Sequence, residues 1–396
     1  MDTARWIRGP VGHGATGRLT RVGLKTVLVL VQTVTAANRL ADVLPVIDGD
    51  HRVQPVYAVP HGADAWHGVE SHVRSLGGLV LPWEQAIREK WDLVVSTCRE
   101  GIEQVHGNLL MLPHGAGAGK SRLRSRMSTA TEPTTGLDRE VLVRSGRIIP
   151  TRIALHTDAD LRLIAGRCPE ARSRAFIAGD PCLDRMLASR PLRERYRAAM
   201  GASPGQDLVL LTSTWSPESA FGRHPDLPAR LVDEFPAARV GLVLHPNVWA
   251  VHGASAIRGW LSRALTRGLV VVPPERGWQG AVLAADVVVG DHGSTTAYAL
   301  AVGARVALAA APVDNLRRGS VSDQVRRMAT TLDHGSPLAP QLARAAAVPA
   351  FAGVLSSRIG EAHARLREAV YQPLGLPEPD WAATPGCVPV PAVLPW

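Results

Sequence analysis

Cysteine and aromatic residues are scarce in this sequence of 396 residues. The four cysteines, Cys98, Cys168, Cys182 and Cys387, lie far apart and form no C-x-x-C pair. This spacing argues against a disulfide framework and a cysteine zinc site, and it indicates a reduced, cytoplasmic protein. Aromatic residues make up only 5% of the chain, and no basic stretch is interleaved with them as in nucleic-acid-binding modules. We therefore expect no specific nucleic-acid partner.

Long apolar runs are also absent. No segment approaches the roughly 18 apolar residues of a membrane-spanning helix. Arginine and lysine residues precede the apolar run 27–31, as in a signal peptide, but this run is short and Gln32 follows it. We interpret the run as a first buried strand. Any contact with a membrane would then be peripheral, at its inner face.

Basic residues exceed acidic ones, so the formal charge is +9 and the pI is near 10.1. The surface should attract anions such as nucleotides, phosphorylated substrates or an acidic membrane. Hydrophobic residues make up 46% of the chain, which is typical of a globular protein. The length exceeds what one core usually supports, so we expect two domains.

Strand and helix patterns alternate along the chain from Lys25 onward. This alternation predicts parallel sheets with helices on both faces, in two Rossmann-like halves. We expect strands at 25–32, 53–59, 79–81, 92–97, 109–112, 153–156 and 175–178 in the first half, and at 208–212, 240–244, 269–272, 287–289 and 306–309 in the second. The predicted parts are a loose basic arm (1–24), an N-terminal domain (25–200), a C-terminal domain (205–355), a helix (356–372) and a Pro-rich tail (373–396). Seven prolines between Pro373 and Pro395 predict an extended tail, with disorder as the alternative.

The turn after the strand 287–289 carries the most informative polar residues. It contains Asp291, His292, Gly293, Ser294, Thr295 and Thr296, and good helix formers follow. A helix that begins here directs backbone N–H groups and its positive dipole end at whatever lies above the strand. The turn therefore predicts a phosphate site, to which the three hydroxyls can add hydrogen bonds. An ordinary capped helix is the alternative.

A glycine-rich loop follows the strand 109–112. It begins with His114 and Gly115 and ends with Gly119-Lys120-Ser121, but a Walker motif needs a glycine where His114 stands. Lys120 and Arg122 make its rim basic. We expect His114 to meet a ligand at this strand end, with a solvated loop as the alternative.

Two further strand ends in the second half carry polar residues. The strand 240–244 leads into His245-Pro246, a histidine well placed to donate to a phosphate. The strand 208–212 leads into Thr214 and Trp215. Because ligands bind outside the carboxyl ends of parallel strands, we expect these loops to line one site. No clustered metal motif accompanies them, and neither a metal nor a cofactor is expected.

In their order, these motifs resemble those of the CDP-glycerol glycerophosphotransferases of teichoic acid synthesis, within the GT-B fold. The resemblance rests on His114-Gly115, Gly179-x-Pro181-x-x-Asp184, Thr214-Trp215, His245-Pro246 and the run from Asp291 to Thr295. It departs from the family at Cys182, where the family usually has arginine, and at Val243, where it has a basic residue. The resemblance implies two Rossmann-like domains facing across a cleft, with the donor in the second and the acceptor in the first.

We therefore expect a transferase that moves a glycosyl or polyol-phosphate group from a nucleotide-diphosphate donor to a hydroxyl acceptor, which could be phosphorylated or lipid-linked. His114 would be the general base, because an imidazole can take a hydroxyl proton at neutral pH. His245 and the helix start at 294–296 would stabilise the leaving group. Two alternatives are a sugar-nucleotide 2-epimerase of the same fold and a non-catalytic protein that binds nucleic acid or anionic lipid.

Overall fold

The computed structural model describes residues 6–12, 15–61, 68–97, 99–117, 136–312 and 316–396. The chain forms two compact units. The first contains the described residues of 1–114, 136–181 and 360–385, and the second those of 115–117, 182–359 and 386–396. No helix in the described part of the chain is long and apolar enough to cross a membrane.

The first unit is built on a seven-stranded sheet in the order β3-β2-β1-β4-β5-β8-β9. All of its strand pairs are parallel. The strands are β1 (Lys25–Leu30), β2 (Val53–Ala58), β3 (Val80–Leu81), β4 (Lys90–Ser96), β5 (His106–Met111), β8 (Arg152–Leu155) and β9 (Ala175–Ile177). A short antiparallel hairpin, β6 (Val143–Arg144) and β7 (Arg147–Ile148), precedes β8.

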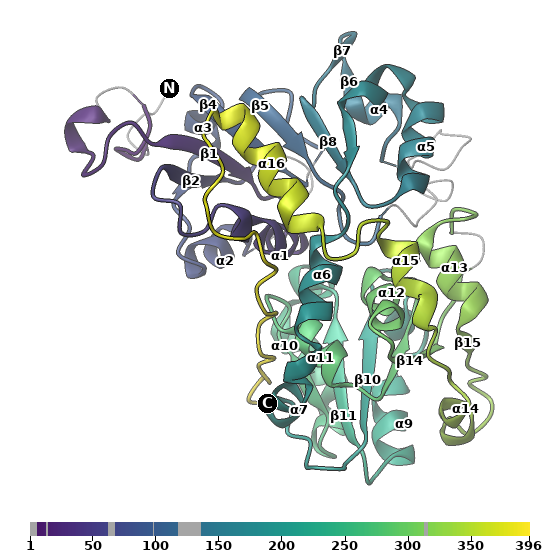
Figure 1. The fold of residues 1–396 in the computed structure, drawn as a ribbon. Helices are drawn as coiled ribbons and strands as arrows, with labels where there is room; N and C mark the ends of the chain where they lie inside the picture. Colours follow the sequence, from purple (N-terminus) through teal and green to yellow (C-terminus); the bar gives the residue numbers. More distant parts are fainter. Residues whose placement is uncertain (1–5, 13–14, 62–67, 98, 118–135, 313–315) are drawn as a thin grey trace. The chain divides into compact units, whose positions relative to one another are not determined.

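Successive residues of β1 point to opposite faces of this sheet, and each face is covered. Val27 and Val29 belong to one apolar cluster, and Leu28 and Leu30 belong to another. The helices of the unit are α1 (Val34–Val43), α2 (Val69–Ser75), α3 (Trp83–Ala86), α4 (Arg139–Leu142), α5 (Asp158–Arg167) and α16 (Ala362–Leu374). Helix α16, from the far end of the chain, lies along the face shared with α1 and α2 (Figure 1).

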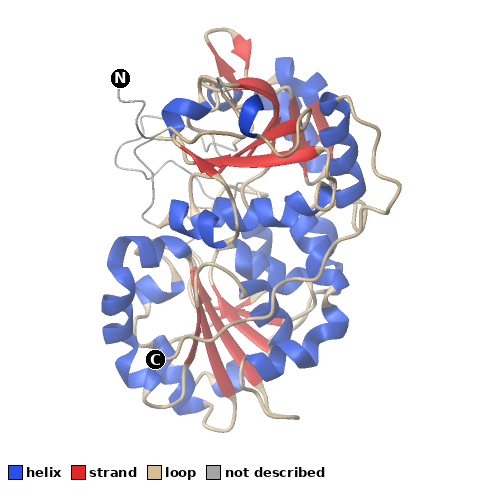
Figure 2. Ribbon diagram, turned by 90° about the vertical axis from the view of Figure 1, so that its left-hand side faces the viewer, coloured by secondary structure: helices blue, strands red, loops and turns tan. Residues whose placement is uncertain are grey.

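The second unit is built on a six-stranded parallel sheet in the order β12-β11-β10-β13-β14-β15. Its strands are β10 (Leu208–Ser213), β11 (Arg239–Leu244), β12 (Val270–Val272), β13 (Val287–Gly290), β14 (Arg305–Leu308) and β15 (Thr330–Thr331). Its helices are α6 (Pro181–Ala188), α7 (Arg193–Ala199), α8 (Ala220–Arg223), α9 (Leu227–Glu234), α10 (Pro246–Leu265), α11 (Trp278–Ala284), α12 (Ser294–Ala301), α13 (Val321–Met328), α14 (Ala339–Ala343) and α15 (Ala352–Leu355). Figure 2 shows helices on both faces of this sheet.

The α/β class and the two Rossmann-like halves predicted from the sequence are confirmed. Several details differ. The stretch 100–105, whose composition favours a helix, is a turn, and the hairpin β6–β7 was not expected. The C-terminal helix, expected at 356–372, spans Ala362–Leu374. The stretch 182–200, expected in the first half, belongs to the second unit, because Leu183, Met186 and Tyr196 are buried in its core.

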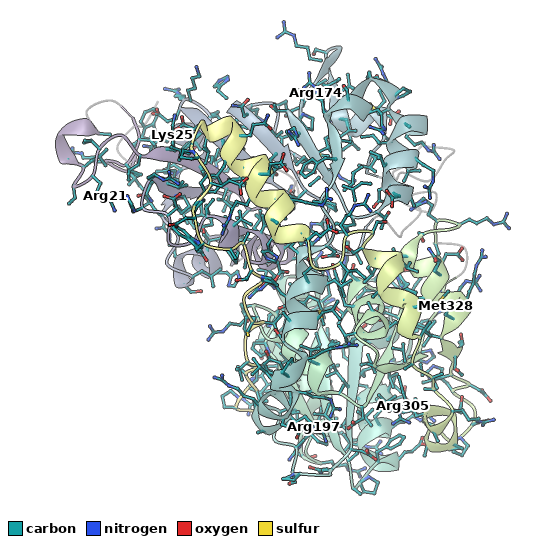
Figure 3. All side chains as sticks on the ribbon, viewed as in Figure 1. Arg21, Lys25, Arg174, Arg197, Arg305 and Met328 are labelled. Atoms are coloured by element: carbon teal, nitrogen blue, oxygen red, sulfur yellow. The ribbon has the colours of Figure 1, made fainter. Side chains whose placement is uncertain are left out.

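Buried polar contacts fix this stretch to the second unit. Arg197 on α7 (Figure 3) donates to the carbonyl of Ala284 at 2.9 Å and to Asp286 at 2.8 Å. Asp286 in turn accepts from the backbone N–H of Leu208 at 2.8 Å. One carboxylate therefore ties α7 to the start of β10.

Candidate functional site

His114 lies three residues beyond the end of β5 in the first unit, where the sequence places it. Its side chain is exposed. The surrounding protein limits its hydration, and the guanidinium groups of Arg99 and Arg39 repel a proton, so the pKa of His114 falls to about 4. Water that reaches the exposed ring screens these charges and works against the lowering. The imidazole is neutral at pH 7 and can accept a proton.

A buried ionic cluster joins α1 to the ends of β8 and β9 in the same unit, and it was not predicted from the sequence. Arg39 on α1 donates through Nη1 to Asp180 Oδ1 at 2.8 Å. Its Nη2 lies 2.5 Å from His156 Nε2, and His156 Nδ1 lies 3.6 Å from Asp180 Oδ2. The three residues are 5%, 0% and 3% exposed, in the order Arg39, Asp180 and His156. A histidine directly after a strand was the one available signal.

In the second unit, Asp291 joins two strand-end loops. Its Oδ2 accepts from the backbone N–H groups of Thr214 and Ala220, both at 2.9 Å. Its Oδ1 accepts from the N–H of Gly293 at 2.9 Å. The side chain is 1% exposed. Asp291 therefore holds the loop after β10 against the turn after β13.

The turn after β13 leads directly into α12. Gly293 is the residue before the helix and has no side chain with which to cap it. Ser294 is exposed, and its Oγ accepts from the N–H of Ala116 at 3.3 Å. Thr295 is half-buried. The first N–H groups of α12 and these hydroxyls form a polar surface suited to a phosphate.

Two residues of the predicted turn face inward instead. Thr296 is fully buried, and its Oγ1 accepts from the N–H of Asp291 at 3.2 Å. His292 is buried, and its carbonyl accepts from Ser322 Oγ at 2.9 Å. These contacts support the turn rather than present a group to solvent.

His245 follows β11 and begins α10. Its Nδ1 accepts from the N–H of Asn247 at 3.1 Å. Since a nitrogen that accepts cannot carry the proton of a neutral ring, Nε2 carries it and can donate. Trp215, from the loop after β10, is 42% exposed, and its ring centroid lies 6.4 Å from that of His245.

The glycine-rich loop reaches the second unit at Gly115. Gly115 has φ +69°, and a Cβ there would lie 2.9 Å from Ser294 Oγ, so only glycine fits without strain. Lys120 and Arg122, the predicted basic rim, lie outside the described residues. Within the described part of the chain, no group of three or more histidine, cysteine or acidic side chains is arranged to hold a metal ion.

Comparison with known proteins identifies the fold. No protein-family model and no curated protein matches the sequence. Solved structures do match. A variant of the wall teichoic acid polymerase TagF aligns over 89% of both chains with a TM-score of 0.61 and 11% identity. MnaA of S. aureus, solved with UDP, aligns over 92% of this chain and 100% of its own, with a TM-score of 0.53 and 13% identity.

A third structure, UDP-GlcNAc 2-epimerase from Neisseria meningitidis bound to UDP-GlcNAc, aligns over 88% of this chain and 99% of its own, with a TM-score of 0.50 and 14% identity. The fold is of the GT-B type. At these identities the similarity shows the fold alone, and the chemistry must be argued from the residues of this chain.

Proposed function

We propose that this protein is a transferase that moves a glycosyl or polyol-phosphate group from a nucleotide-diphosphate donor to a hydroxyl acceptor. The observation that carries the proposal is the pair of donors at strand ends of the second unit. The start of α12 presents backbone N–H groups and the Ser294 hydroxyl, and His245 presents a protonated Nε2. Two such groups suit a diphosphate, which offers several acceptor oxygens.

In this mechanism His114 is the general base. Its neutral imidazole takes the proton of the acceptor hydroxyl, whose oxygen attacks the sugar carbon or the phosphorus of the donor. The bond to the leaving phosphate breaks, and the electron pair stays on the leaving oxygen. The N–H groups of α12 and His245 Nε2–H stabilise that negative charge. A bound diphosphate also raises the pKa of His114, because a nearby anion favours the imidazolium form.

The 2-epimerase is less well supported by the described strand ends. An epimerase would be favoured by carboxylates that face the sugar. Two carboxylates lie at the described strand ends. Asp291 accepts three backbone N–H groups, and Asp180 is paired with Arg39. Both already serve as structural acceptors. The transferase needs no carboxylate and fits these contacts better.

Titration calorimetry with CDP, UDP, GDP and dTDP tests the donor site. We expect one of them to bind, and the double change Ser294→Ala and Thr295→Ala to weaken its binding by on the order of 1 to 3 kcal/mol, about 5- to 150-fold. The matched control is Ser255→Ala, which removes an exposed hydroxyl on α10 of the same unit. Equal affinity of the double variant and the control would show that the diphosphate lies elsewhere.

A peripheral membrane role depends on the nature of the acceptor. A lipid-linked acceptor would bring the protein to an anionic surface, to which a net charge of +9 is attracted. Sedimentation with vesicles of anionic and of neutral lipid measures this attraction. Binding that disappears in high salt is the expected result.

A further inference from the structure

Three neighbouring strands of the first unit end at one edge of the sheet, and each leads to a titratable residue. Strands β5, β8 and β9 are adjacent and parallel. His114 follows β5, His156 follows β8, and Asp180 follows β9. The register pairs Met111 with Ile153, and His114 and His156 each stand three residues beyond that pair in the sequence. Adjacent strands lie about 4.8 Å apart. The buried cluster thus lies beside the loop that carries His114.

The contacts of the cluster fix its protonation. A guanidinium only donates, so the 2.5 Å contact with Arg39 makes His156 Nε2 an acceptor and leaves the ring proton on Nδ1, on the side of Asp180. Burial lowers the pKa of His156, Asp180 acts in the opposite direction, and Arg39 lowers it further. The cluster therefore holds one cation, one anion and a neutral ring.

Stability alone is a poor reason for such a cluster. Removing an ion pair from water costs several kcal/mol per ion, and apolar side chains of similar size often stabilise a core as well or better. The question is which group the fixed guanidinium of Arg39 acts on. His114 is the nearest candidate, because it follows β5, the strand next to β8, at the end of the sheet where the cluster lies. Burial, Arg99 and then Arg39 lower the pKa of its ring.

We propose that Arg39 is a positioning residue for His114: held by Asp180 and His156, its guanidinium keeps a positive charge beside the imidazole and so keeps that ring in its proton-accepting form. The inference deepens the proposed function, because it explains how a histidine in this loop would stay a base in mildly acidic solution. Arg39 itself is buried and bonded within the cluster, so it acts through His114 and not on the substrate.

The test is the titration of the His114 ring by NMR in the full chain labelled at histidine, without donor or acceptor. His114→Gln assigns the signal among the 14 histidines. The key variant combines Arg39→Met with Asp180→Asn, which removes the charge and its partner together and leaves no buried ion unpaired. The matched control is Arg152→Met, at the opposite end of β8.

In the unsubstituted protein we expect the ring to titrate well below pH 6.5. In the double variant the midpoint should rise, while burial and Arg99 still keep it below 6.5, and in the control it should stay unchanged. Arg39→Lys keeps the charge and should keep the low midpoint. An unchanged midpoint in a folded double variant would overturn the inference.

If the double variant does not fold, Arg39→Gln with Asp180→Asn replaces it, because the Gln amide can still donate to His156 while both charges are removed. The midpoint of His114 should again rise, and an unchanged midpoint would overturn the inference. The titration requires no substrate. An unchanged titration would therefore overturn only the role of Arg39, and a failed transfer assay would overturn only the proposed transferase function.

Discussion

At the scale of single residues, the buried carboxylate of Asp291 accepts hydrogen bonds from three backbone N–H groups of the second unit. Asn in its place keeps the shape but offers one acceptor oxygen in place of two, so at least one buried N–H group loses its partner. We expect Asp291→Asn to lower the free energy of unfolding by about 1 to 3 kcal/mol and to weaken donor binding. Urea unfolding measures the first effect.

Asp233→Asn is the control for Asp291, because Asp233 pairs with Arg263 and Arg267 at the surface. Surface ion pairs contribute little. Equal loss of stability in the two variants would show that the backbone contacts of Asp291 are not the reason for its effect.

The histidines of the first unit predict a pH dependence of stability. The pKa of His114 is lower in the folded chain than the value of about 6.5 expected when unfolded, and burial shifts His156 in the same direction. As the pH falls below about 6.5, the unfolded state therefore binds protons first, and the free energy of unfolding decreases until the folded pKa, near 4 for His114, is reached.

His114→Gln removes one of these groups and should make that decrease shallower between pH 6.5 and 4. Chemical unfolding at several pH values measures the slope. An identical slope in the variant would mean that the pKa of His114 is not lowered in the folded protein.

The positions of site residues were predictable from strand patterns, but their partners were not. His114, His245 and Asp291 could be placed at strand ends because parallel strands present their carboxyl ends at one edge. Arg39 could not, because its partner Asp180 is 141 residues away and a helix pattern does not show which arginine turns inward. The same limit hid the inward orientation of Thr296.

At the scale of elements, the Pro-rich tail has a defined place. It is extended, as predicted, but the prediction left disorder open, and the structure instead attaches residues 386–396 to the second unit. Val388 is buried, its N–H donates to Ser189 Oγ, and its carbonyl accepts from Tyr196 Oη. The N–H of Leu394 donates to the carbonyl of Val271 on the edge strand β12.

Removing residues 386–396 should therefore destabilise the second unit and uncover that strand edge. We expect a loss of roughly 2 to 4 kcal/mol, from one buried valine and a few hydrogen bonds, together with concentration-dependent association through the free edge. Calorimetry and light scattering measure these effects. Removing residues 395 and 396 alone is the control, since it leaves Val388 and Leu394 in place.

The differences at this scale have physical causes. The stretch 100–105 has the composition of a helix but forms a turn, because Gly101 adopts φ +75°, which lies outside the right-handed helical region. Helices α6 and α7 follow the first sheet in the sequence, yet their apolar residues fit the second core, and burial decides the unit to which a helix belongs. Sequence periodicity predicts the existence of a helix better than it predicts the core against which the helix packs.

At the scale of the whole molecule, strand alternation was sufficient to predict a two-unit α/β chain, and the resemblance in strand-end motifs pointed to the GT-B type. The chemistry depends on whether His114 and the groups of the second unit act on one donor. Single-turnover transfer measures this most directly. The protein is incubated with CDP-, UDP-, GDP- and dTDP-linked donors and a hydroxyl acceptor, and the released nucleotide is followed by ³¹P NMR.

We expect one donor to release its nucleotide as the acceptor is modified: a diphosphate for glycosyl transfer, or a monophosphate for polyol-phosphate transfer. His114→Ala should lower this rate by roughly 100- to 10,000-fold while donor affinity, set in the second unit, barely changes. A normal rate in His114→Ala would contradict the proposed mechanism. So would the release of no nucleotide from any donor by a protein that binds DNA or anionic vesicles tightly.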